Sequence, residues 1–302
     1  HIHLGSIADL QDAFKELSRS IELDATNLDA HVKLGELYLM GNELEKAKEQ
    51  ANKVLASAPN HAEAHALRGH ASLRQQALQD AIEHLALALQ QDPTNVQFSL
   101  DLGSAYHAAG KIDNAADTLT AAINTSPSSV PARLARGDFY FLSRRHAEAE
   151  SDYKKGIDLD PSNDAAYIKL ANLYRLTNRL TEAEEVCLKL STQKPQHENP
   201  QIILGDFYTT IGNQDKALTS YEKATTLNPA SLVARDRLLN HLLDTGKFSD
   251  AEQRIHALLS INKDDKTTQF FQARLLIAQG KGAEAVPTFQ RMIKEEPWVP
   301  VF

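Results

Sequence analysis

The chain has one cysteine, Cys187, among its 302 residues. A framework of internal disulfides is therefore excluded, and a single cysteine gives no information about the compartment. Long apolar runs are also missing, because no stretch approaches the roughly 18 apolar residues that a membrane-spanning helix needs. Neither a disulfide-stabilised mini-protein nor a membrane-spanning protein fits this composition.

Basic residues are outnumbered, with 32 Lys and Arg against 40 Asp and Glu, which gives a formal net charge of -8. Proteins that bind nucleic acid need clustered Lys and Arg to neutralise phosphates, so we expect no nucleic-acid partner. The content of 42% hydrophobic and 24% charged residues is typical of a folded protein. At this length the chain is either two domains or one extended array.

The most informative feature is a period of 34 residues, shown by two residue types. An alanine recurs at every step of this length through most of the chain, and a proline recurs over a shorter range. The series are Ala13, Ala47, Ala81, Ala115, Ala149, Ala183, Ala217, Ala251 and Ala285, and Pro59, Pro93, Pro127, Pro161, Pro195 and Pro229. Such self-similarity indicates a repeat architecture.

Counted from Leu28, the period defines eight repeats whose residues we number 1 to 34. They span 28-61, 62-95, 96-129, 130-163, 164-197, 198-231, 232-265 and 266-299. In the fourth repeat the apolar residues Ala132, Ala135 and Phe139 follow helical spacing. Glycines such as Gly110 and Gly212 suit the end of a first helix. Each repeat is therefore predicted to be a pair of antiparallel helices.

The recurring letters have structural roles in such a pair. Position 8 is glycine in five repeats, including Gly137 and Gly205, and position 20 is always alanine. Small residues allow two helices to approach closely. Tyrosine at position 11 and an apolar residue at position 24 would fill the space around the crossing, and proline at position 32 would turn the chain into the next repeat.

This pattern resembles the tetratricopeptide repeat family, whose signature of small, aromatic, alanine, aromatic and proline residues covers 34 positions. Residues 28-299 follow it without insertion or deletion. The chain departs from it at Ser72 and, in the seventh repeat, at Leu239, Leu242 and Lys263. The resemblance implies an all-α protein, a right-handed solenoid or α-α superhelix with first helices on the concave face.

The two ends suggest a piece of a longer protein. Residues 1-27 read as the second half of a preceding repeat, with a helix expected over 6-27, and residues 300-302 would begin a further repeat. The residue runs within its repeats are similar to those of long bacterial repeat proteins of the cell envelope, including lipoproteins linked to exopolysaccharide export and protein sorting. The location stays open between the cytoplasm and a bacterial envelope or periplasm.

We expect no catalytic site, metal, cofactor or small-molecule substrate. A solenoid packs each repeat only against its neighbours and forms a curved surface rather than an enclosed active site. Cys187 stands at position 24, where other repeats place packing residues. His61, His65 and His70 have helical spacing, but no further ligand completes a zinc set, which favours packing over metal binding.

The resemblance implies instead a non-catalytic scaffold that binds a protein or peptide through positions 2, 5, 9, 12 and 13 of the first helices. Position 5 is apolar in seven of eight repeats and position 9 is polar in all eight, a pattern that suits an extended peptide. The candidates are Leu100, Leu134, Ile168 and Ile202 at position 5; Glu36, His70, Asp138, Asn172, Asp206 and Asn240 at position 9; and Arg74, His107, Phe141 and Arg175 at positions 12 and 13.

Three alternatives stay open. Position 9 could be polar merely because it is exposed, and position 5 apolar because it half-packs against the next repeat. The chain could self-assemble by stacking its repeat ends. It could also be the targeting arm of a larger protein, such as a glycosyltransferase or a component of exopolysaccharide export.

Overall fold

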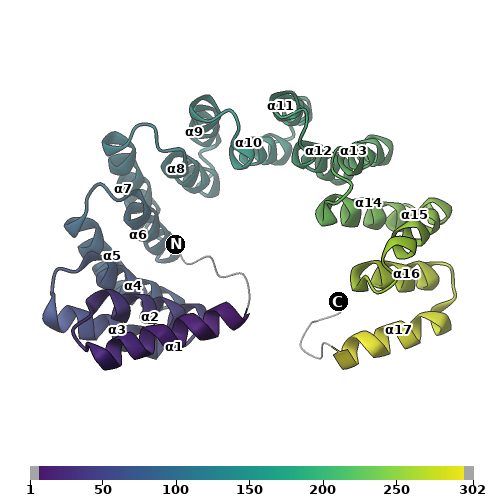
Figure 1. Ribbon diagram of the computed structural model, residues 1–302. Coiled ribbons are helices and arrows are strands. Elements are labelled where there is room, and N and C mark those ends of the chain that lie inside the picture. The colour runs from purple at the N-terminus through teal and green to yellow at the C-terminus, as the bar shows by residue number, and fades with distance from the viewer. Residues whose placement is uncertain (1–6, 296–302) are drawn as a thin grey trace. The chain divides into compact units, whose positions relative to one another are not determined.

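The computed structural model describes residues 7-295. Over that range it contains seventeen α-helices and no strand, so the all-α prediction is confirmed (Figure 1). The chain divides into two compact units, His1–Lys169 and Leu170–Phe302. In both, the helices follow one another as hairpins, which is the arrangement of the α-α superhelix fold class.

The helices alternate between a first and a second member of each hairpin. The first helices are α2 (Leu28–Met40), α4 (Ala62–Arg74), α6 (Val96–Ala108), α8 (Val130–Leu142), α10 (Asp164–Leu176), α12 (Asn199–Thr210), α14 (Leu232–Asp244) and α16 (Lys266–Ala278). The second helices are α1 (Ile7–Leu23), α3 (Leu44–Ser57), α5 (Leu78–Gln91), α7 (Ile112–Thr125), α9 (His146–Leu159), α11 (Leu180–Gln193), α13 (Gln214–Leu227), α15 (Phe248–Ile261) and α17 (Gly282–Glu295).

The helix expected over 6-27 is present as α1, and the division between the units falls inside α10. The expected start of another repeat at 300-302 lies outside the described residues, as do residues 1-6.

Most first helices begin at a capping side chain that occupies position 34, whereas α12 begins after Glu198, whose side chain makes no capping hydrogen bond. The side chain of Asn27 accepts a hydrogen bond from the amide of Ala30, and Ser231 accepts from Ala234 in the same way. Such an acceptor satisfies an amide that has no partner within the helix. His61 holds the equivalent place, and its Nδ1 accepts from the amide of Ala64 at 3.4 Å. In these repeats the polar residue after the turn therefore sets where the first helix starts.

The turn between the two helices of a hairpin requires a left-handed residue at position 15 in each of the eight repeats. Glycine supplies it at Gly110, Gly212, Gly246 and Gly280, and other residues supply it at Asn42, Gln76, Arg144 and Asn178, all with φ between 60° and 79°. Glycine adopts this conformation without the Cβ clash that other residues meet. The predicted helix ends at Gly110 and Gly212 are thus confirmed.

The helix crossings have the predicted packing. Position 20 is closed to solvent, with Ala47 and Ala149 both 0% exposed. A Cβ on Gly137 would lie 2.6 Å from Cε1 of Tyr153, a distance that real side chains do not tolerate. The small residues therefore let first and second helices approach closely, and the residue at position 24 fills the space left free.

Consecutive first helices also touch one another, because α2 packs on α4, α4 on α6 and α6 on α8 in the first unit. In the second unit α12 packs on α14 and α14 on α16. Each unit therefore presents a continuous face built from first helices. We call this the first-helix face; it carries the positions predicted to bind a partner.

Candidate functional site

Position 5 contributes less to the first-helix face than the sequence suggested. Leu134 and Ile202 are only 7% and 6% exposed, and Leu100 packs against the cluster of Ala115 and Leu119. Ile168 is more open, at 37%. For Leu134 and Ile202 the alternative that position 5 packs against neighbouring helices is therefore the one that holds.

Asp138, at position 9, has internal partners. Its Oδ1 accepts the hydroxyl hydrogen of Tyr153 at 2.8 Å, and Lys169 Nζ donates to both carboxylate oxygens at 2.9 and 2.7 Å. Burial raises the pKa of Tyr153, and the negative charge of Asp138 acts in the same direction. The phenol therefore stays protonated and able to donate.

Asp206 repeats this arrangement in the second unit. Tyr221 donates its hydroxyl hydrogen to Oδ1 of Asp206 at 2.7 Å, and Arg237 Nε lies 3.0 Å from the same oxygen. In both repeats the tyrosine is at position 24 and the cation at position 6 of the following repeat. The two aspartates therefore tie a hairpin together and join it to the next first helix. Both candidate residues at position 9 are therefore already engaged in contacts within the protein.

Other position 9 side chains also link neighbouring helices. His70 Nε2 lies 2.9 Å from Oδ2 of Asp101, which again stands at position 6 of the next repeat. Asn240 accepts a hydrogen bond from Arg274 and donates to the carbonyl of Asp236.

Among the candidate residues at position 9, Glu36 and Asn172 are the exposed ones. Partial burial raises the pKa of Glu36 even so, with the nearby positive charge of Lys33 opposing that effect.

The residues at positions 12 and 13 are partly used in packing. Arg74 is exposed, and its guanidinium donates to the carbonyl of Leu39. His107 stacks on Phe139 with ring centroids 5.3 Å apart, and Phe141 lies 5.6 Å from the ring of His146. Arg175, the remaining candidate at these positions, is half-buried.

A polar cleft of about 350 Å³ brings two of the predicted residues together in the second unit. Asp206 and Asn240 both line it, from α12 and α14. The other lining residues are Thr209, Gln214, Tyr221, Arg237, His241, Asp244 and Thr245. The cleft offers carboxylate, amide, hydroxyl and guanidinium groups, so it can both donate and accept hydrogen bonds.

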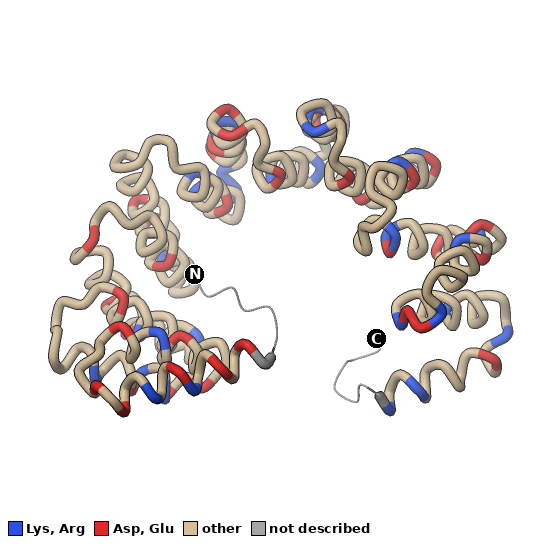
Figure 2. The backbone as a smooth tube through the Cα atoms, in the orientation of Figure 1, with Lys and Arg blue, Asp and Glu red and all other residues tan. Residues whose placement is uncertain are grey.

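The cations at position 6 and the tyrosines at position 24 were not predicted to be part of this face. The signal was available, because a basic residue follows each aspartate by 31 positions, at Lys169 and Arg237. Figure 2 shows Lys and Arg scattered among Asp and Glu within each unit, rather than gathered on one helix.

The next groups to consider are those that could act as a nucleophile or as metal ligands. Cys187 is 1% exposed, and burial raises its pKa to about 12, so the thiolate nucleophile is strongly disfavoured. Across residues 7-295, no three His, Cys, Asp or Glu side chains are grouped so that they could hold a metal ion. No helix within this range is long and apolar enough to cross a membrane.

Models of known protein families match the sequence along nearly the whole chain. A family model for the tetratricopeptide repeat matches residues 8-71, 72-136 and 140-204, and two further models of the same description match 201-231 and 237-297. The chain belongs to the tetratricopeptide repeat family. Tetratricopeptide repeats in general act as non-catalytic scaffolds for protein interactions. No curated protein sequence matches the chain significantly.

Solved structures of other tetratricopeptide repeat proteins share the fold. Pseudomonas aeruginosa pilF is 20% identical, with 69% of this chain and 95% of that chain covered and a TM-score of 0.51. The C-terminal part of a repeat-containing protein from Cytophaga hutchinsonii is 15% identical, with 76% and 95% covered and a TM-score of 0.53. At these identities the likeness concerns the tetratricopeptide fold alone.

Proposed function

We propose that this tetratricopeptide repeat chain is a non-catalytic scaffold, and that the cleft between α12 and α14 binds an extended peptide segment of a partner protein. The observation that carries the proposal is that Asp206 and Asn240 meet in one open, polar cleft on the first-helix face. An extended peptide presents its own amides and carbonyls at regular intervals and needs donors and acceptors alike.

The charges of the cleft favour main-chain recognition over a strongly charged ligand. Asp206 is paired with Arg237 at 3.0 Å, and Asp244 lies 3.4 Å from Arg274. Because each acid already has a basic partner, little net charge is left to attract an ion. The side chains of Asp206 and Arg237 are 42% and 51% exposed, so a peptide can reach them without breaking the pair.

The proposal is tested with peptides selected from a random phage-displayed library on the immobilised chain and then measured by fluorescence anisotropy. Thr209 is exposed and lines the cleft, so Thr209→Lys should weaken binding at least about tenfold by filling it. Thr219→Lys makes the same change on an exposed residue of α13 that does not line the cleft, and should leave affinity unchanged. Equal affinity for wild type and Thr209→Lys places the site elsewhere.

Self-association is a second candidate, favoured by an apolar cleft of about 490 Å³ between α1 and α2. Phe14 and Met40 line this cleft and are 39% and 57% exposed. If two copies bury this surface, light scattering should show a mass that rises with concentration, and Phe14→Asp should abolish the rise. A constant monomer mass at all concentrations would exclude the idea.

A further inference from the structure

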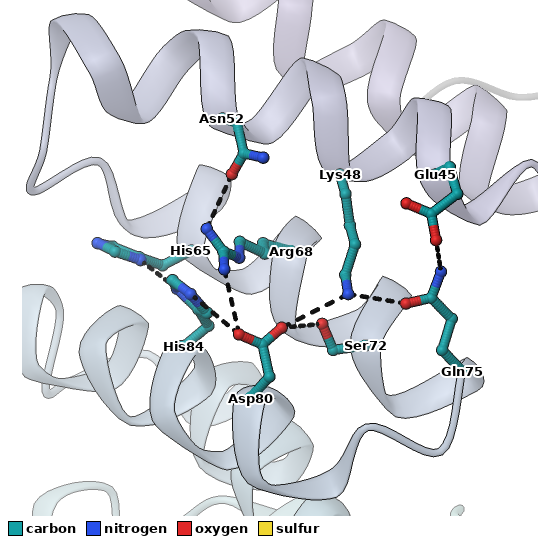
Figure 3. A network of polar contacts seen from close by, with 9 residues as sticks. All are labelled: Glu45, Lys48, Asn52, His65, Arg68, Ser72, Gln75, Asp80 and His84. Atoms are coloured by element: carbon teal, nitrogen blue, oxygen red, sulfur yellow. Dashed lines mark hydrogen bonds and ion pairs between the residues drawn. The ribbon is translucent and has the colours of Figure 1, made fainter.

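Two histidines meet inside the second repeat, where α4 packs on α5 (Figure 3). His65 and His84 are 6% and 8% exposed, and their rings stack with centroids 5.1 Å apart. Their Nδ1 atoms are 2.9 Å apart, and Nε2 of His65 lies 2.9 Å from the carbonyl oxygen of Pro59. This contact confirms that His65 packs between helices.

The contact limits how many protons the pair can bind. A carbonyl oxygen only accepts, so Nε2 of His65 carries a hydrogen, and its Nδ1 in the neutral ring is an acceptor. Nδ1 of His84 must then donate. Only one hydrogen fits between two nitrogens at this distance, so a proton added to Nδ1 of His65 would set two N–H groups against each other and break the contact.

The remaining protonation site, Nε2 of His84, is only partly compensated. It lies 3.6 Å from Oδ1 of Asp80 on its own helix. That carboxylate is already shared, because Arg68 of α4 lies 3.2 Å away, Ser72 donates at 2.5 Å, and Lys48 of α3 lies 3.6 Å away.

Burial is the largest influence on the pKa of His84 and lowers it. The positive charge of Arg68 also lowers it, Asp80 opposes both effects, and His65 and Glu83 act weakly in opposite directions. The charged groups that act on the ring are thus the cation Arg68 and the carboxylates Asp80 and Glu83, and Lys48 of α3 lies beside Asp80.

The first repeat contains a matched site without this conflict. His31 and Gln50 occupy the same repeat positions, 4 and 23. Nδ1 of His31 lies 2.7 Å from Oε1 of Gln50, and its Nε2 lies 3.2 Å from the carbonyl of Ala25. A glutamine amide can turn to present oxygen or nitrogen, so it accommodates either protonation state of the histidine.

We propose that the His65 and His84 pair is an acid-sensitive joint that loosens the α4–α5 hairpin as the pH falls below about 6.5, the ordinary titration range of histidine. Beyond the one hydrogen that each neutral ring carries, the opened hairpin can bind two added protons, whereas the closed contact can bind one at most. Opening therefore takes up protons, and the closed state loses stability as the pH falls. Well below the histidine pKa, each proton taken up raises the opening equilibrium constant about tenfold per pH unit.

Hydrogen exchange of the full chain, followed by mass spectrometry between pH 7.5 and 5.5 and corrected for the intrinsic rate, tests the joint. Between pH 6.5 and 5.5 the opening constant of α4–α5 should rise by about fivefold or more relative to that of α2–α3, because one extra proton on a group of pKa about 6.5 gives that factor. His84→Gln copies the arrangement of the first repeat and should remove this difference. An equal rise in both hairpins, or an unchanged rise in His84→Gln, overturns the proposal.

A second measurement needs no substitution. In the wild-type protein, NMR titration of the imidazole carbons should show at most one of the two rings becoming charged while the contact persists. If both rings titrate independently near pH 6.5 while the hairpin is still protected from exchange, the claim that the closed pair binds at most one added proton is refuted.

Discussion

The substitution Gly137→Ala tests whether a helix crossing depends on the absence of a single methyl group. A Cβ at this position would lie 2.6 Å from Cε1 and 2.9 Å from Cδ1 of Tyr153. In an open helix, replacing glycine with alanine stabilises by about 0.5–1 kcal/mol. Here we expect Gly137→Ala to destabilise the α8–α9 hairpin by about 1–3 kcal/mol, because overpacking a tight core has that cost.

The tyrosine ring cannot simply move aside. Tyr153 is 2% exposed, and its hydroxyl donates to Asp138 at 2.8 Å. A hydrogen bond to a charged group contributes about 1.5–3 kcal/mol, so losing it would cost as much as the clash. The fifth repeat shows a compatible pair, since Ala171 at position 8 accompanies the small Cys187 at position 24.

Hydrogen exchange of the α8 and α9 amides measures this local opening free energy. Gly282→Ala in α17 is the control, because a Cβ there meets nothing within 4 Å. In a Tyr153→Ala background the cost of Gly137→Ala should vanish or become a small gain. If Gly137→Ala stabilises the wild-type hairpin, or has the same cost without the tyrosine, the close-approach argument is wrong.

Three further predictions concern single side chains. Arg136→Met should lower the free energy of unfolding by about 3 kcal/mol in urea denaturation. The reason is that Asp152, whose side chain is 5% exposed, would lose hydrogen bonds of 2.8 and 2.7 Å. A decrease in that free energy of less than about 1 kcal/mol would contradict this. Cys187 should react with a thiol reagent only after unfolding, given its burial and a pKa of about 12, so rapid labelling of the native chain would disprove it. Arg144→Gly should raise the Tm, because it removes up to about 1 kcal/mol of backbone strain from a left-handed residue at φ 61°. A lower Tm for this variant would show that the strain is not significant.

The fold was predictable because its determinants are local and repeated. Alanine at position 20, as at Ala149, and glycine at position 8, as at Gly137, recur at a fixed spacing of 34 residues. The helix end at Gly110 follows because glycine readily adopts the left-handed conformation of the turn. The site was less predictable. Leu134 has the same apolar character whether it faces a partner or the next helix, and only packing decides between them.

The sequence by itself determined the period, the two helices of each repeat and the small residues at their crossings, since each depends on neighbours within a few turns of helix. Only the tertiary structure decided what Asp138 and Asp206 do. Their cations, Lys169 and Arg237, stand 31 residues further along the chain and come within 3.0 Å only because one first helix packs beside the next. Both carboxylates, which the sequence marks as candidates for partner binding, are therefore links between repeats.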